Sequence, residues 1–146
     1  VWTAWSRRLL VSADEVVLVA APDLANLRNV KNIQDNLGPA RANDAKIKLV
    51  MNMVGVPKRP EIPVKDFSSS LNLEASLVIP FDAKLFGAAA NNGQMVAEVS
   101  GGAKIGQLFE DFGRLLSGKP DLRKPKRGLL GGLKSPKLSF SLGKKS

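Results

Sequence analysis

Apolar residues along the chain follow two spacings in alternation, one typical of strands and one typical of helices. Three short runs are nearly continuous and rich in β-branched residues: Glu15–Ala20 (EVVLVA), Ile47–Met51 (IKLVM) and Ala75–Ile79 (ASLVI). Runs of this length are typical of strands that are buried on both faces of a parallel sheet. We therefore expect three buried strands.

Helical spacing fills the intervals between these runs. After Pro22, apolar residues recur every three or four positions from Asp23 to Leu37, and Gly38 and Pro39 end that helix. The same spacing predicts four more helices, over residues 1–11, 64–71, 83–90 and 102–116. Strands separated by helices of this length imply right-handed crossovers and a parallel sheet. The predicted fold class is α/β.

The first predicted helix places Trp2, Trp5, Leu9 and Leu10 on one apolar face, and no residue that could cap it precedes it. We therefore expect that upstream sequence has been removed. Three strands also make a small sheet for a domain that is covered on both faces. The complete sheet is accordingly expected to contain further strands, encoded before Val1.

Charge divides the chain into two parts. The net charge is +9, and residues 117–146 contribute +8 of it, which leaves +1 for residues 1–116. Proline and glycine interrupt any periodicity after Gly118. We therefore predict a folded domain over residues 1–116 and a basic tail over residues 117–146 that is disordered when free.

Composition excludes several kinds of chemistry. Cysteine and histidine are both absent, which excludes disulfides, metal sites built on these residues and Cys–His nucleophile pairs. No apolar run approaches the roughly 18 residues of a membrane span. The absence of cysteine fits a cytoplasmic setting, which we expect. No Gly-x-x-x-x-Gly-Lys-Ser/Thr loop is present, so the chain is not expected to hydrolyse a nucleotide alone.

Candidate binding residues follow the predicted strands, because ligands of open α/β sheets bind beyond the carboxyl ends of the strands. Asn52 follows the second strand, and its amide offers an acceptor and two donors that suit the edge of a purine. Alternatively, Asn52 closes a turn through its own backbone. Pro80, Phe81 and Asp82 form a corner that could meet a base, although a capping role is favoured for Asp82.

Asn91 and Asn92 are weaker candidates. With Gly93 and Gln94 they form a polar stretch between a helix and an apolar segment. A plain turn explains this stretch most simply. The alternative is a loop that lines a site.

Four segments resemble known proteins. Asp14–Asn29 (DEVVLVAAPDLANLRN) is similar to the corresponding segment of MinD/ParA-type P-loop ATPases. Val54–Ile62 (VGVPKRPEI), Ile79–Asp82 (IPFD) and Ala88–Gln94 (AAANNGQ) resemble CpaE/TadZ, the ATPase-like assembly and localisation proteins of the Flp (Tad, type IVb) pilus. The resemblance extends from about Val1 to Leu116.

The resemblance implies an ATP-binding, often dimeric α/β domain at a cell pole that helps to place or assemble the pilus secretion apparatus. Its partners would be a second copy and the Tad pilus assembly proteins. Asn52 would contact adenine, and Pro80 and Asp82 would border the same base. The phosphate loop and the Mg²⁺ ligands of the ATP site would precede Val1, so the chain would be the C-terminal part of a P-loop NTPase fold without its phosphate-binding half.

The tail carries no motif of that family. Its clustered basic residues, among them Arg123, Lys124, Lys126 and Arg127, alternate with leucines. Such a segment could rest on an anionic membrane or a partner, bind nucleic acid without sequence preference, or only be solvated. Peripheral binding at the inner membrane is therefore one expectation for its location.

Two other functions stay open beside pilus assembly. One is a nucleic-acid-binding protein of the DNA-partitioning kind, which the nearly neutral body disfavours. The other is a scaffold that has lost ATPase activity.

Overall fold

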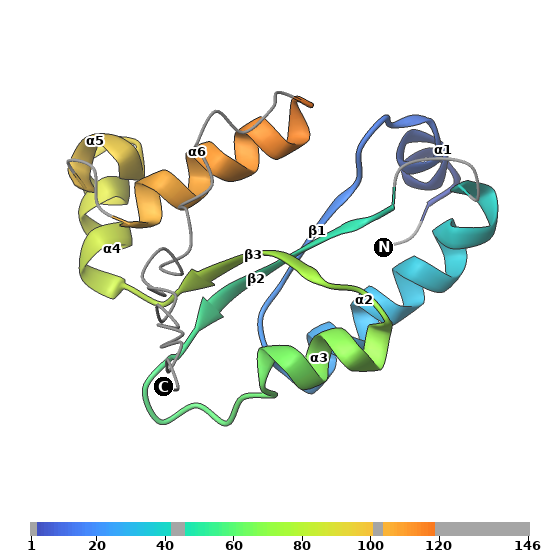
Figure 1. Ribbon diagram of the computed structural model, residues 1–146, viewed down its shortest axis with the longest axis horizontal. Coiled ribbons are helices and arrows are strands. Elements are labelled where there is room, and N and C mark those ends of the chain that lie inside the picture. Colours follow the sequence, from blue (N-terminus) through green and yellow to red (C-terminus); the bar gives the residue numbers. More distant parts are fainter. Residues whose placement is uncertain (1–2, 42–45, 101–103, 119–146) are drawn as a thin grey trace, which may run out of the picture.

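The computed structural model describes residues 3–41, 46–100 and 104–118, and within them a parallel sheet forms the centre (Figure 1). Its strands are β1 (Val17–Ala20), β2 (Lys48–Val54) and β3 (Ala75–Pro80), in the order β1-β2-β3. The predicted α/β class and the parallel pairing are confirmed. β2 is the central strand, and β3 forms one edge and β1 the other within this described sheet.

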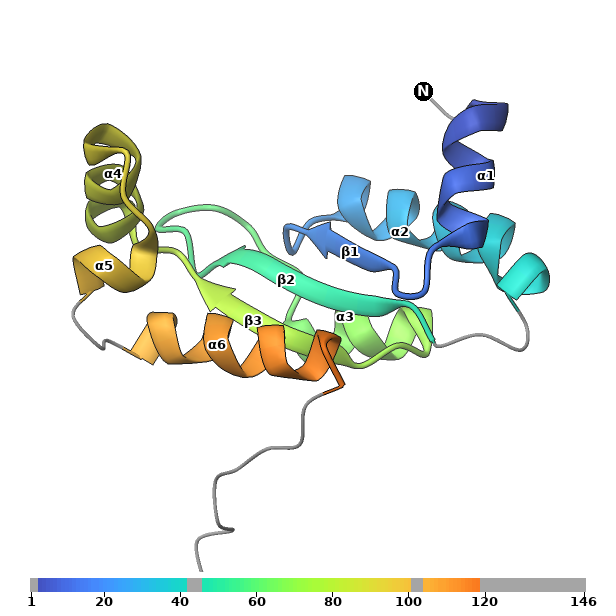
Figure 2. The same cartoon turned by 90° about the horizontal axis from the view of Figure 1, so that it is seen from above.

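Helices cover both faces of this sheet (Figures 1 and 2). The α-helices and the 3₁₀ turn η1 are α1 (Ala4–Ser12), α2 (Leu24–Leu37), η1 (Gly38–Arg41), α3 (Val64–Leu71), α4 (Ala83–Asn92), α5 (Val96–Ser100) and α6 (Lys104–Leu116). Helices α2 and α3 lie on one face and α6 on the other, while α4 and α5 lie beyond the carboxyl end of β3. No described helix is long and apolar enough to cross a membrane.

The core has two parts, one on each face of β2. Successive β2 residues point to opposite faces, so Leu49 and Met51 pack towards α2 and α3, and Val50 packs towards α6. Phe67 of α3 is completely buried in the first part. The prediction of a strand buried on both faces is therefore confirmed for the centre of β2.

The same prediction is wrong for β1. This strand begins at Val17, and Val19 is 60% exposed. The cause is the position of α6, which packs over β2 and β3. Among the described residues, Val17 still packs partly against this cluster, but Val19 on the same face of β1 is left uncovered. The other face of β1 is covered, since Ala20 is buried in the core formed with α2 and α3.

Helix α1 also differs from the expectation. It begins at Ala4 and is capped by Thr3, whose hydroxyl accepts from the Ser6 amide at 3.1 Å while the Ser6 hydroxyl accepts from the Thr3 amide at 2.9 Å. Its apolar face does not enter the core, because Trp5 is 73% exposed and Leu9 is 49% exposed. Trp2 lies outside the described residues.

Arg41 in η1 holds the end of α1. This arginine is 6% exposed. Its guanidinium donates to the backbone carbonyls of four residues around the end of α1: Leu10, Val11, Ala13 and Asp14. The last carbonyls of a helix have no partner within the helix, so a cation there satisfies them. The turn exists because Gly38 stays in the right-handed helical region after α2 ends at Leu37.

Three smaller differences concern the C-terminal half. Helix α4 extends past the predicted end to Asn92, and α5 was not predicted. Phe109 of α6 is 39% exposed, although it was expected to point inward. The predicted start of α6 at Gly102 and the tail after Gly118 lie outside the described residues.

Candidate functional site

The carboxyl ends of β2 and β3 border a cavity of about 260 Å³. Its lining residues are Asn52, Met53, Pro80, Phe81, Asp82, Ala83, Phe86 and Gly87. The structure therefore brings together the three main candidates from the sequence, Asn52, Pro80 and Asp82, although they come from different segments. Their role in binding stays a prediction.

A bulge at the end of β2 determines how Asn52 is presented. Met51 is opposite Val78 and Val54 is opposite Pro80, so β2 carries one residue more than β3 over this interval. Met53 takes up the difference with a φ of 56°, in the left-handed region. Such bulges change the direction of the neighbouring side chains and are common next to binding sites. Asn52 is thus inside the strand, at this irregularity, and not after the strand as predicted.

The side-chain amide of Asn52 makes one hydrogen bond within the protein, through its oxygen. Its Oδ1 accepts from the Met53 backbone amide at 2.8 Å, which is the turn-closing contact considered as the alternative role. No hydrogen bond of its Nδ2 is found among the described residues. A carbonyl oxygen has two lone pairs, so the side chain can still accept one bond and donate two. The local contact fixes the orientation of the amide and leaves it able to bind.

Asp82 has the capping role that the sequence favoured. Its Oδ1 accepts from the Leu85 backbone amide at 2.9 Å at the start of α4. The preceding residue joins the two loops, since the Phe81 amide donates to the Val54 carbonyl at 2.8 Å. Asp82 therefore fixes α4 against the cavity, and Phe81 presents an aromatic ring that is 37% exposed.

A carboxylate clamp holds the loop that follows β2. Glu61 accepts from the Gly55 amide at 2.9 Å, from the Val56 amide at 3.0 Å and from the guanidinium of Arg59 at 2.8 Å. Arg59 also donates to the Met53 carbonyl. The Gly55 amide bond, supported by Arg59, holds the pKa of Glu61 below its ordinary value. The loop beside Asn52 is therefore preorganised by an ionised carboxylate.

The end of β1 is tied to this loop. The Ile62 amide donates to the Pro22 carbonyl at 2.9 Å. Asp23 caps α2 by accepting from the Asn26 amide at 2.8 Å. This backbone bond, the Asn26 side chain and the charge of Arg59 together lower the pKa of Asp23. All three strand ends are thus joined into one rigid edge.

Asn91 and Asn92 do not line the cavity. They are the last residues of α4, both exposed, and Asn92 Nδ2 donates to Gln94 Oε1 at 3.1 Å. Gly93 then ends the helix in the left-handed conformation, with a φ of 63°. The structure shows a helix end, which agrees with the simpler of the two roles that the sequence allowed.

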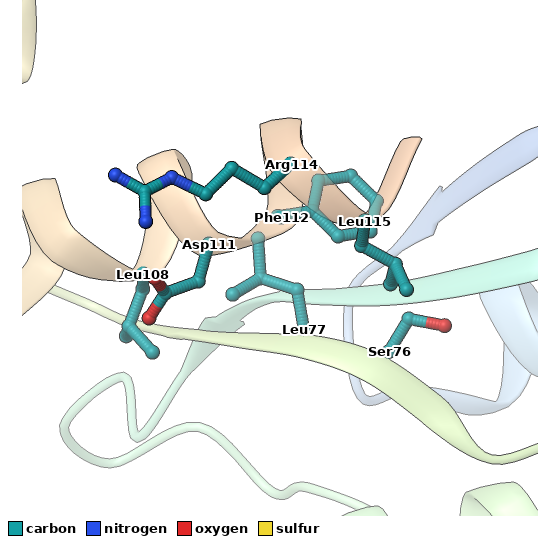
Figure 3. Close-up of a pocket in the computed structure, with 7 residues that line it drawn as sticks. All are labelled: Ser76, Leu77, Leu108, Asp111, Phe112, Arg114 and Leu115. Atoms are coloured by element: carbon teal, nitrogen blue, oxygen red, sulfur yellow. The ribbon is translucent and has the colours of Figure 1, made fainter. Parts of the chain in front are cut away.

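A second cavity, of about 330 Å³, lies between β3 and α6 (Figure 3). It is lined by Ser76, Leu77, Leu108, Asp111, Phe112, Arg114 and Leu115. Ser76 is at the start of β3, so this cavity is away from the carboxyl ends of the strands. It contains none of the binding residues that the sequence predicted.

The described residues bring no metal-binding cluster to the cavity at β2 and β3. Within the described ranges, no three acidic, histidine or cysteine side chains gather where they could hold a metal ion. The basic residues Arg123, Lys124, Lys126 and Arg127 lie outside the described residues.

Sequence reasoning missed four residues that shape this site: Arg59, Glu61, Phe86 and Gly87. The two charged residues lie in a proline-rich loop, which has no periodic pattern from which their contacts could be predicted. Phe86 and Gly87 are on a helix predicted over 83–90, but the register of that helix against β2 cannot be read from the helix itself. A local signal was present in the Arg59-Pro60-Glu61 sequence, four residues after Gly55, where an arginine and a carboxylate stand two positions apart.

Solved structures with a similar fold include a ParA family ATPase and a MinC:MinD complex. A ParA family ATPase from Chlorobium tepidum TLS has a TM-score of 0.63 and 19% identity, over 75% of this chain and 45% of that one. The MinC:MinD cell division protein complex of Aquifex aeolicus has a TM-score of 0.60 and 22% identity, over 77% of this chain and 46% of that one.

Neither protein-family models nor curated proteins give a match. The chain spans less than half the length of the two similar structures. Identities this low describe the fold alone. The chain therefore has a partial MinD/ParA-like P-loop NTPase fold.

Proposed function

We propose that this chain supplies the base-side wall of an adenine-nucleotide site. The observation that carries the proposal is the cavity at the carboxyl ends of β2 and β3, where Asn52, Pro80 and Asp82 meet. Ligands of open α/β sheets bind at this end of the strands. The resemblance of the sequence to MinD/ParA-type ATPases implies that Asn52 contacts adenine and that Pro80 and Asp82 border the same base.

The chemistry of the cavity fits a base. Its volume, about 260 Å³, is below the roughly 300–1,000 Å³ of sites that enclose whole small molecules, so it suits a ring and not a complete nucleotide. The wall is mostly apolar, with Phe81 and Phe86 available to the faces of a ring. Asn52 Nδ2 and the free lone pair of its Oδ1 can pair with the acceptor and donor on the adenine edge.

The phosphates and Mg²⁺ of ATP would be held by other parts of the protein. No Walker-type loop is present in the sequence. Phosphoryl transfer depends on phosphate and metal contacts, so this chain contributes recognition and orientation of the base and not the hydrolytic step.

The biological role that we propose is assembly and localisation of a Flp (Tad) pilus system, from the resemblance to CpaE/TadZ. In this proposal the protein is cytoplasmic, acts at a cell pole as a homodimer and contacts Tad pilus assembly proteins. The basic tail would add affinity for an anionic membrane surface, at roughly 1 kcal/mol for each basic residue near the lipid.

Calorimetric titration with ATP, GTP and adenosine tests the nucleotide site. ATP and adenosine should bind more tightly than GTP, and Asn52→Ala should weaken ATP binding about tenfold, the effect of losing one good hydrogen bond. Asn92→Ala is the matched control, because this asparagine is on α4 but outside the cavity. Equal ATP affinity in the wild type and in Asn52→Ala would remove Asn52 from the site.

Pilus counts test the biological role separately. Cells that carry Asn52→Ala in place of the wild-type gene should assemble fewer Flp pili than cells that carry Asn92→Ala. Wild-type numbers of pili in a strain that lacks the gene would overturn the pilus assignment and leave the nucleotide site standing.

A further inference from the structure

Gly87 occupies a position where the fold has no need of a glycine. It is in the interior of α4 (Ala83–Asn92), where glycine is less favourable than alanine. It is absent from the residues with positive φ, unlike Gly55 and Gly93. Apart from its two chain neighbours and the nearby backbone of its own helix, a Cβ built on it meets no heavy atom within 4 Å among the described residues. Neither backbone conformation nor packing therefore explains it.

Its surroundings supply another explanation. Gly87 lines the cavity that also contains Asn52. Ala83, one turn earlier on α4, lines the same cavity, and residues four apart share one face of a helix. The helix thus presents two small residues to the cavity, which Phe81 and Phe86 also line. A larger side chain at either position would reduce the space in front of Asn52.

We propose that Gly87 enables binding by keeping open the space in which the flat ring of the ligand lies against α4. This inference rests on the proposed nucleotide site and adds a steric determinant to it. The binding site then explains why a residue of low helix propensity occupies position 87, since the described fold alone would tolerate alanine.

Two measurements on three variants test this proposal. Gly113 in α6 is the matched control, because a Cβ there also meets nothing within 4 Å and Gly113 does not line the cavity. Gly87→Ala and Gly113→Ala should both raise the Tm, by roughly 2–8 °C, since alanine favours the helix. Gly87→Leu adds a side chain that fills the space and still favours a helix.

Titration with ATP then distinguishes the role of Gly87 from that of Gly113. Gly113→Ala should bind ATP as the wild type does, Gly87→Ala more weakly, and Gly87→Leu at least about tenfold more weakly, as expected for overpacking of a filled site. Wild-type ATP affinity in Gly87→Leu, with ATP bound by the wild type, would overturn the role of Gly87 alone. If the wild type binds no adenine nucleotide, the proposed function fails and this inference fails with it.

A lower Tm in Gly87→Ala than in the wild type would also overturn the proposal, because glycine would then have a structural purpose. This outcome needs no ligand, so the Tm measurement is a test even if Gly87→Leu does not fold.

Discussion

The carboxyl edge of the sheet and the β1–α1 side are built in opposite ways. At the carboxyl edge, main-chain hydrogen bonds join Phe81 to Val54 and Ile62 to Pro22, and the Glu61 carboxylate fixes the loop between them. On the β1–α1 side, Val19 and Trp5 are 60% and 73% exposed. The predicted binding residues are thus beside loops that main-chain bonds and a carboxylate hold in place, which is what a preorganised site requires.

The largest effect should come from the core behind the carboxyl edge. Phe67→Ala removes a fully buried ring that packs between α3 and the sheet. The free energy of unfolding should fall by about 3–5 kcal/mol, as measured by urea denaturation. Trp5→Ala is the matched aromatic variant on the open side, and its effect should be close to zero. A comparable loss in both variants would show that α1 is packed in solution and would break the comparison.

Arg41 should produce the next largest effect, because its guanidinium connects η1 to the end of α1. Arg41→Ala leaves four backbone carbonyls without their charged donor. We expect a loss of roughly 2–3 kcal/mol of stability and faster hydrogen exchange of the α1 amides. Arg8→Ala, an exposed arginine on α1, is the control. Unchanged exchange in Arg41→Ala would mean that α1 is held by something else.

The cap at the cavity should contribute less. Asp82→Ala removes the acceptor of the Leu85 amide at the start of α4. Stability should fall by about 1 kcal/mol, with hydrogen exchange increased only in the first turn of α4. If exchange increases equally throughout α4 and β3, Asp82 supports more than a cap.

The smallest change in stability should come from Glu61→Gln, which alters the carboxylate clamp, and its size should depend on pH. The pKa of Glu61 is lower in the folded protein than its ordinary 4.5. Its contribution to stability is therefore complete above pH 4.5 and is lost as the pH falls through the lower folded value. The stability difference between the wild type and Glu61→Gln, from urea unfolding, should shrink over that interval. A difference that is constant from pH 7 to pH 2 would contradict this role.

The same comparison shows what the sequence could predict. Strand β2 was predicted because burial on both faces requires a nearly continuous apolar run. Helix α3 was predicted from helical spacing and has the predicted bounds, Val64–Leu71. The exposure of Val19 was not predictable, because a β-branched run is the same whether or not a second helix covers it. That depends on where α6 packs.

For the site, the order of strands brought Asn52, Pro80 and Asp82 together as expected, since parallel strands end at one edge. The bulge at Met53 and the clamp from Glu61 depend on contacts between residues that no local pattern connects. The capping role of Asp82 was predictable, because a cap is determined by residues a few positions apart.

The measurement that tests the central claim most directly is a ¹H–¹⁵N NMR titration of the protein with adenosine. The account predicts shifts of the Asn52 side-chain amide and of the backbone amides of Phe81 and Gly87, which line the cavity at β2 and β3. Shifts at Ser76 and Leu115 instead, which line the cavity between β3 and α6, would contradict it, as would no shift in either place.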